Sequence, residues 1–231
     1  MRTMKTFTSF ITILFATLIA IPSFAQNTAT SPATASGASA AQPANATGQP
    51  NPQEMMKQMM ELSKLNENHK LLADTNGNWN YTIKLWMNPD PNAPPQESKG
   101  TATRKSIMGG RYVTMDVSGK MQMPGADSKP KDFQFKGMGI EGYDNVKKKF
   151  FGSWIDNMGT GISTASGTYD PDKKTITYQG EEIDPASGQK MKNKMVVHLI
   201  DKDKFEEDMY KVVGDKDIRV MHLTCVRKAA K

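Results

Sequence analysis

The chain has 231 residues, with 30 Lys and Arg, 24 Asp and Glu, and a formal charge of +6 at pH 7. The lysines are scattered or lie in turns such as "NVKKKF", and no basic stripe is interleaved with aromatic residues, so we expect a solvated surface and no nucleic-acid partner. Cys225 is the single cysteine, which excludes a fold stabilised by intrachain disulfides.

The first 25 residues have the pattern of a secretory signal peptide. Arg2 and Lys5 precede the apolar run "FITILFATLIAI", and the small residues Ser23 and Ala25 precede Gln26. The run is shorter than the roughly 20 apolar residues of a membrane-spanning helix, so we expect no transmembrane segment in the mature chain. The pattern predicts cleavage near Ala25 and an exported protein, periplasmic or extracellular, whose formal charge falls from +6 to +4 with the loss of Arg2 and Lys5.

Residues 26–52 contain mostly Ala, Ser, Thr, Pro and Gln and no large apolar residue, which predicts a disordered leader. An N-terminal helical segment is expected next, over 53–74. Pro52 stands at the expected helix start, and a second short helical turn is expected over 69–73. The apolar residues that repeat about every 3.6 positions and make the helix amphipathic are Met55, Met56, Met59, Met60 and Leu62.

From Trp79 onward the apolar residues repeat every second position, which is typical of β-strands. Ten strands are predicted, at about 79–87, 98–107, 110–119, 132–143, 148–156, 161–169, 174–182, 191–200, 204–212 and 217–228. The connectors, such as "YDPDKKT" and "VVGDKD", are too short for crossovers, so neighbouring strands must be antiparallel. Because so many strands would leave exposed edges in an open sheet, we predict an all-β protein with a single antiparallel up-and-down β-barrel over 75–229.

The stretch "FGSWIDNMGTGI" combines a strand with a turn. Alternation from Phe150 places Trp154 and Asp156 on the same face of the strand. Asn157 and Gly159 are expected to adopt positive φ angles at the bend that follows.

Several segments together resemble the bacterial domain-of-unknown-function family 1579 (DUF1579), over about residues 52–228. They are "NENHKLLADTNGNW", "SIMGGRYV", "GMGIEGYDNVKKKFFGSWIDNMGTGI", "SGTYD" and "DPASGQKMKNK". The resemblance implies a calycin-like β-barrel and no established activity. The triplet Gly77-Asn78-Trp79 is also similar to the Gly-x-Trp signature of lipocalins, in which an arginine of the last strand covers the tryptophan. Arg227 has the matching position, so we expect Trp79 and Arg227 to form a cation–π contact that closes one end of the barrel.

The sequence contains no recognised catalytic motif. His69, His198 and His222 are the only histidines, and none has a neighbouring nucleophile and acid in a known pattern. For His69 we favour a capping or surface role. His198 and His222 lie on predicted strands, where ligation of a haem inside the barrel remains an alternative. We predict no catalytic residue and no cofactor.

No metal site is predicted either. The stretch "DTNGNWNYTIKL" resembles the start of a calcium loop but has Trp79 at the sixth position, which requires Gly, and Leu85 at the twelfth, which requires Glu. The methionines of "EMMKQMMEL" and "MQM" offer soft thioether ligands for cuprous ion, but we favour adaptable packing for both groups.

The leading functional hypothesis is a barrel whose interior or mouth binds a small, largely apolar ligand. The residues expected at this site are Arg111, Tyr112, Trp154, Asp156 and Asn157. One alternative is a structural or assembly component of the cell envelope, whose protein partners the sequence does not specify. The other is a barrel hydrolase or isomerase that uses Asp156 as a base.

Overall fold

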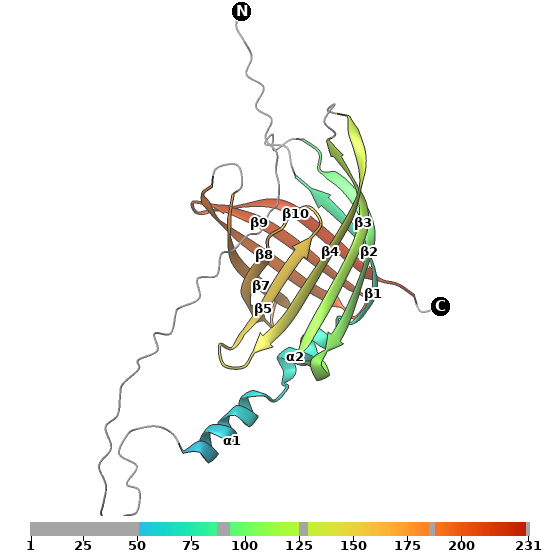
Figure 1. Cartoon of the computed structure of the whole chain (residues 1–231). Helices are drawn as coiled ribbons and strands as arrows, with labels where there is room; N and C mark the ends of the chain where they lie inside the picture. Colours follow the sequence, from blue (N-terminus) through green and yellow to red (C-terminus); the bar gives the residue numbers. More distant parts are fainter. Residues whose placement is uncertain (1–50, 87–92, 125–128, 185–187, 230–231) are drawn as a thin grey trace, which may run out of the picture. The chain divides into compact units, whose positions relative to one another are not determined.

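Ten strands joined by short connections form one closed antiparallel barrel (Figure 1), as the sequence predicts. The computed structural model describes residues 51–86, 93–124, 129–184 and 188–229, so the predicted signal peptide and nearly all of the leader lie outside the described residues. The strands are β1 (Gly77–Leu85), β2 (Gln96–Ile107), β3 (Tyr112–Pro124), β4 (Pro130–Asp144), β5 (Lys149–Asp156), β6 (Ser163–Asp170), β7 (Thr175–Ile183), β8 (Lys190–Asp201), β9 (Lys204–Val213) and β10 (Lys216–Arg227).

Each strand pairs with its neighbours along the chain, and β1 also pairs with β10 to close the ring. This is the up-and-down order expected when every connection is too short for a crossover. Closure leaves no strand edge free to pair with another chain.

Side chains alternate between the inside and the outside of the barrel. On β1, Trp79, Tyr81 and Leu85 point inward and are buried, while Asn78 and Asn80 point outward and are exposed. The register carries this alternation around the barrel, so the inner residues of each strand follow from their pairing partners.

Two helices precede the barrel, and the structure divides the predicted helical segment between them. α1 (Pro52–Leu62) begins at Asn51, whose side chain accepts a hydrogen bond from the Gln53 backbone N–H. α2 (Glu67–Ala73) begins at Asn66, where a capping box formed with His69 starts a new helix. α1 belongs to a different compact unit from the barrel. No helix in the described parts of the chain is long and apolar enough to cross a bilayer.

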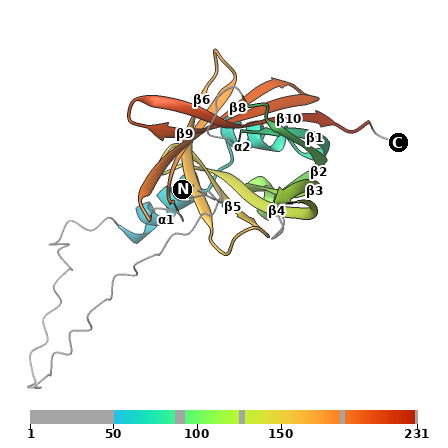
Figure 2. The same ribbon diagram turned by 90° about the horizontal axis from the view of Figure 1, so that it is seen from above.

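α2 packs on β3 and β4 at one end of the barrel, and in Figure 2 it lies within the outline of the ring of strands. Leu72 of α2 is buried in the core, and Leu71 packs against it. We call this the closed end, and the end formed by the other strand termini the open end.

Trp79 and Arg227 meet at the closed end, as the sequence predicts. The guanidinium carbon of Arg227 lies 4.2 Å from the centroid of the Trp79 ring. Arg227 Nε donates a hydrogen bond to the Lys202 carbonyl at 2.8 Å, and Nη2 donates to the Asp74 carbonyl at 3.2 Å. A Cβ atom on Gly77 would lie 2.2 Å from Arg227 Nη1, so only glycine leaves room for the arginine. The packing therefore requires glycine two residues before this tryptophan.

The turn after β5 differs from the prediction. Neither Asn157 nor Gly159 has a positive φ angle, so that expectation was wrong. The Asn157 side chain instead extends the pairing of β5 with β4. Its Oδ1 accepts from the Lys136 backbone N–H at 2.9 Å, and its Nδ2 donates to the Gln134 carbonyl at 2.8 Å. The Asn157 side chain thus forms the two hydrogen bonds to β4 that the backbone of a further strand residue would form.

Candidate functional site

The closed half of the barrel interior is filled by side chains. Five of its inward-facing residues have at most 1% of their surface exposed, namely Trp79, Val113, Phe150, Tyr178 and Cys225. Trp79 also packs edge-to-face against the ring of Phe205, with the centroids 4.8 Å apart. This half is a packed core and leaves no room for an organic ligand.

A buried ion pair crosses the closed half. The guanidinium of Arg104 on β2 donates to the carboxylate of Glu141 on β4, and its Nε donates to Thr75 Oγ1 at 2.8 Å. The other Glu141 oxygen accepts from the Tyr178 hydroxyl at 3.3 Å. Burial alone would lower the pKa of Arg104, but the adjacent Glu141 carboxylate raises it above the ordinary value. Arg104 is therefore charged, and its charge is matched within the core.

Glu207 on β9 lies beside this pair and lines a small cavity. Burial, reinforced by the charge of Glu141, raises the pKa of Glu207 to about 7. The cavity has a volume of about 20 Å³. That is room for about one water molecule, whereas sites for small organic ligands measure about 300 to 1,000 Å³. The cavity is consequently no ligand site.

In the open half, an aromatic ring lies flat against the barrel wall. The indole of Trp154 covers Gly137 and Gly139 of β4, where added Cβ atoms would lie 2.3 Å and 3.2 Å from the ring. Trp154 Nε1 donates to Asp156 Oδ2 at 2.9 Å, and the ring stacks on Phe135 with the centroids 6.5 Å apart. The two glycines therefore make room for the ring against the wall.

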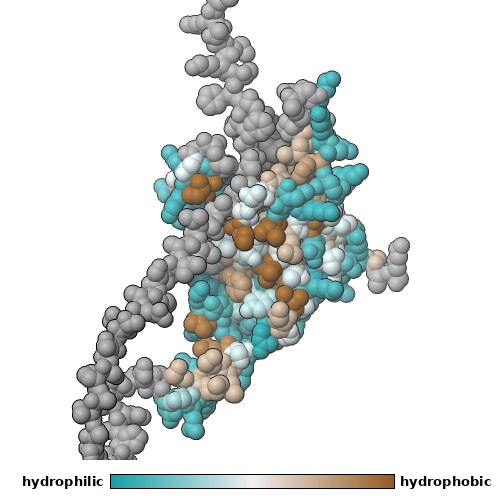
Figure 3. Space-filling view, viewed as in Figure 1, coloured by the Kyte–Doolittle hydropathy of each residue, from teal (hydrophilic) through white to brown (hydrophobic). Residues whose placement is uncertain are grey.

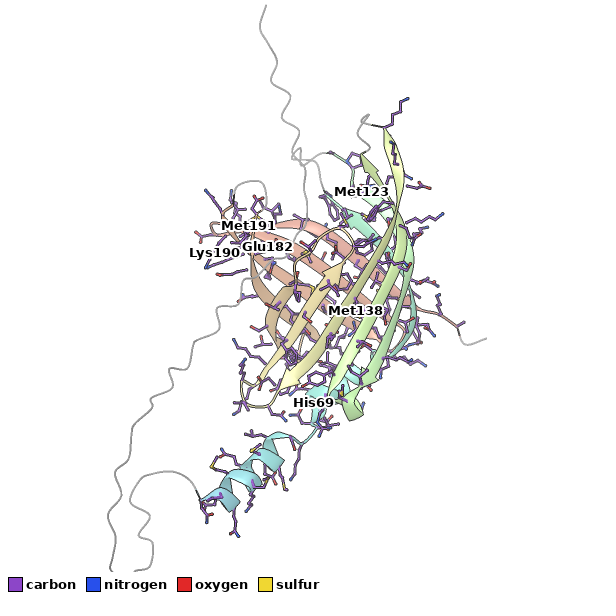
Figure 4. All side chains as sticks on the ribbon, in the orientation of Figure 1. His69, Met123, Met138, Glu182, Lys190 and Met191 are labelled. Carbon is purple, nitrogen blue, oxygen red and sulfur yellow. The ribbon has the colours of Figure 1, made fainter. Side chains whose placement is uncertain are left out.

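Other inward-facing side chains of the open half remain partly exposed. They are Met121 and Met123 of β3, Phe133 and Phe135 of β4, Met191 of β8, Met209 of β9 and Met221 of β10. Since these residues point inward, solvent reaches them from the lumen. Figure 4 shows Met123 and Met191 at the end of the barrel away from His69. The open half thus has an accessible apolar lining rich in methionine.

Two buried polar side chains interrupt this lining. Ser163 of β6 is 4% exposed and Glu182 of β7 is 9% exposed. Ala165 of β6 pairs with Gly180 of β7, and the two strands are antiparallel. Ser163, two residues before Ala165, therefore lies beside Glu182, two residues after Gly180, on the inner face. Within the described residues, Ser163 Oγ and Glu182 Oε2 have no hydrogen-bond partner.

Two neighbouring strands complete this polar row. Asn193 of β8 makes a side-chain hydrogen bond to the Glu182 carboxyl group, and the charge of Lys211 on β9 also acts on it. Burial nevertheless raises the pKa of Glu182 above the ordinary value. An unsatisfied buried polar atom costs about 1 to 3 kcal/mol, and here two such atoms are adjacent. Their position marks a place where a ligand would supply the missing hydrogen bonds.

The structure brings together only part of the site predicted from sequence. Trp154 and Asp156 face the lumen and contact each other. Tyr112 pairs with Gly142 at the closed end and points outward, where it contacts Phe151 edge-to-face at 6.1 Å. Arg111 is exposed in the adjoining turn, with its Nη1 donating to the Met108 carbonyl at 3.3 Å. Asn157 is exposed, and its side chain bonds to the β4 backbone.

Asp156 is poorly placed for base chemistry. Its Oδ2 accepts from Trp154 and its Oδ1 accepts from the Met158 backbone N–H at 2.9 Å. Both carboxylate oxygens therefore orient neighbouring groups.

Glu182 and Ser163 were not predicted as site residues, although the sequence contains a signal for Glu182. In "TITYQGEEI", Ile176, Tyr178, Gly180 and Glu182 share one parity, which places a carboxylate on the apolar inner face. Ser163 carries no such signal because a serine is common at a strand start.

The histidines do not contribute to the lumen of the open half. His69 accepts a hydrogen bond from the Asn66 backbone N–H at 3.2 Å at the start of α2, and burial lowers its pKa. His198 and His222 lie on the outer face around Asp208, with contacts of 3.5 Å and 2.9 Å. Neither can ligate a haem inside the barrel, so that alternative was wrong.

Among the described residues, no group of three or more His, Cys, Asp or Glu side chains could hold a metal ion. The methionines of α1 are exposed, whereas those of "MQM", Met121 and Met123, line the open end.

Fold and site together define a class: a closed antiparallel barrel, packed at one end and open at the other, with a mixed apolar and polar lumen. The chain belongs to the DUF1579 family, described as a protein of unknown function, which matches residues 64–227. No curated protein matches the chain.

Two solved structures are similar at low levels. A redesigned β-barrel is 18% identical, with a TM-score of 0.30, and the match covers 72% of this chain and all of that one. A protein of unknown function from the DUF3598 family of Nostoc punctiforme is 8% identical, with a TM-score of 0.23, and the match covers 71% of this chain and all of that one.

Proposed function

We propose that the open half of the barrel binds a small, largely apolar ligand. The observation that carries the proposal is the inner face of this half, where apolar side chains stay partly exposed and two buried polar atoms have no partner among the residues that the structure describes. Apolar walls with a few convergent polar groups are the usual composition of small-molecule sites. Trp154 contributes a flat surface, and Glu182 and Ser163 offer polar anchors.

Native mass spectrometry and solvent extraction of the protein purified from its own host test this proposal. We expect a small molecule that co-purifies in stoichiometric amount and is lost on denaturation. The substitution Met209→Trp, which places a bulky ring on the inner face of β9, should reduce the recovered ligand. A chain that is always empty, in wild type and variant alike, would overturn the proposal.

We also propose that the barrel works outside the cytoplasm. The proposal is supported by the basic head, apolar run and small residues of the first 25 positions. Fractionation of host cells, with N-terminal sequencing of the recovered protein, should find a mature chain that starts near Gln26. A full-length chain confined to the cytoplasm would contradict it.

A role in envelope assembly is the second candidate, because an apolar patch lies on the outer face of β4, β5 and the turn that follows (Figure 3). Its members Met138, Ile155 and Ile162 are 39%, 40% and 54% exposed. Met138 and Ile155 pair across the two strands. If this face binds a protein, a partner should co-purify with the wild type and be lost from Ile155→Lys, while a lumen ligand stays bound.

A further inference from the structure

The geometry points to a ligand that joins a flexible apolar chain to a primary amine, with the amine N–H groups donating to Glu182 and Ser163. This inference rests on the proposed function and specifies the chemistry of the ligand. It starts from two buried atoms of the open half that have no hydrogen-bond partner in the described parts of the chain, Glu182 Oε2 and Ser163 Oγ.

In its ionised form the Glu182 carboxylate has only hydrogen-bond acceptors. The Asn193 side chain already forms a hydrogen bond with this carboxylate, which leaves Oε2 open. The group that fills the open position at Oε2 must therefore be a donor. Ser163 accepts through its oxygen lone pairs, so one head group with several N–H bonds can satisfy both side chains. A protonated primary amine has three such bonds and forms charge-assisted hydrogen bonds with a carboxylate.

The charges on the inner face favour the same choice. Glu182 and Asp156 place two carboxyl groups on the walls formed by β5 and β7. Lys211 is the cation whose charge acts on Glu182, and it is partly exposed, so it is solvated without a ligand. An anionic head group at Ser163 would instead lie beside the Glu182 carboxyl group, on which the charge of Asp184 also acts. Like charges at short range in a partly dry site repel each other strongly, so the site disfavours the carboxylate of a fatty acid.

The apolar part of the ligand follows from the methionines. Met191 pairs with Glu182 across β7 and β8, and Met209 pairs with Met221 across β9 and β10. Unbranched thioether side chains adapt their shape to flexible partners. An alkyl chain that starts at Glu182 would therefore run along this methionine surface.

Calorimetric titration of the purified full chain with four dodecyl probes tests the inference, each probe kept below the concentration at which it forms micelles. The probes are dodecylamine, dodecyltrimethylammonium, dodecanol and dodecanoic acid. We expect dodecylamine to bind at least about tenfold more tightly than the other three, since only it combines charge with N–H donors.

Two glutamates that are neighbours on β7 provide a matched pair of variants. Glu182→Gln should weaken dodecylamine binding by about tenfold or more. Glu181→Gln, at an exposed outward position 4.0 Å from Lys190, should leave it unchanged. If Glu182→Gln does not fold, Ser163→Ala removes the second acceptor and should also weaken binding of the amine.

The outcomes separate this inference from the proposed function. Suppose that dodecanol or dodecanoic acid binds as tightly as dodecylamine and that Glu182→Gln does not weaken binding of the amine. This result would contradict the inferred amine head group but would leave the proposed ligand-binding function intact. No binding of any probe, together with an empty chain from the host, overturns both.

Discussion

Arg227 meets Trp79 through the flat face of its guanidinium and meets backbone carbonyls through its edge. A cation–π contact contributes about 1 kcal/mol, and carbonyls left without a donor cost about as much again. We therefore predict that Arg227→Ala lowers the free energy of unfolding by about 2 to 3 kcal/mol, measured by urea denaturation.

Lys228→Ala is the matched control, because Lys228 is exposed and its backbone bond to Asn78 survives the change. Arg227→Lys should not restore stability, since an ammonium lacks the planar fork that reaches several carbonyls. Equal stability of the Arg227→Ala and Lys228→Ala variants would show that the contact does not stabilise the barrel.

Glu207 gives the stability of the barrel a dependence on pH. Its pKa rises from 4.5 to about 7 in the folded protein, so the folded state binds the proton more tightly than the unfolded chain. Its contribution is therefore fully present below about pH 4.5 and is lost as the pH rises through about 7. The loss amounts to roughly 3 kcal/mol.

Glu207→Gln should remove this decline. The free energy of unfolding of the variant should therefore rise relative to that of the wild type, by up to roughly 3 kcal/mol between about pH 4.5 and pH 8. Besides burial, the charges of Glu141 and Asp208 raise the pKa of Glu207 and that of Arg104 lowers it, and all three groups are present in both proteins. Glu206→Gln is the control on the outer face, where Glu206 pairs with Lys204 at 2.7 Å. Denaturation curves that shift in parallel for wild type and Glu207→Gln at every pH would contradict the assignment.

At the scale of the strands, the glycines of β4 decide where Trp154 lies. A Cβ on Gly137 would lie 2.3 Å from the indole, whereas a Cβ on Gly152 of β5, also inward-facing, would have 3.9 Å of space. We predict that Gly137→Ala destabilises the barrel by about 1 to 3 kcal/mol and shifts the tryptophan fluorescence, because the ring must leave the wall. Gly152→Ala should change neither, and an equal response of the two variants would mean that the ring does not rest on Gly137.

The period of two in the sequence was enough to predict ten strands and the shared face of Trp154 and Asp156, and the short connectors were enough to predict the antiparallel order. Closure was predictable because so many short strands cannot leave their edges free. The contact of Trp79 with Arg227 was predicted from the resemblance of Gly77-Asn78-Trp79 to the lipocalin Gly-x-Trp signature and from the positions of the two residues on the first and last strands.

The position of each side chain along the barrel axis was not predictable from the sequence. It depends on the register of each pair of strands, and a shift of two residues keeps the face but moves a side chain along the axis. Tyr112 and Arg111 were therefore placed beside Trp154, although they lie at the closed end. The outward direction of Tyr112 was available in the sequence, because Val113, Met115 and Val117 occupy the opposite parity. The adjacency of Ser163 and Glu182 came only from the register of β6 with β7.

Across the whole barrel, polar groups are treated differently at the two ends. In the closed half, Arg104 and Glu141 satisfy each other within a packed core. In the open half, Ser163 and Glu182 are left unsatisfied beside apolar side chains that solvent reaches. The packed half is consistent with a stabilising core, and the open half is the part to which the proposed ligand site belongs.

Methionine methyl groups report directly on the central claim that the lumen of the open half is the binding site. Met191, Met209 and Met221 lie on the inner face, while Met138 lies on the outer face. Labelling the methionine methyl groups with ¹³C gives each of them an NMR signal that can be followed during a titration. When dodecylamine, dodecanol and dodecanoic acid are added in turn, at least one should shift the three inner signals and leave Met138 unchanged. Shifts confined to Met138, or inner signals that respond to no probe, would contradict a ligand site in the lumen.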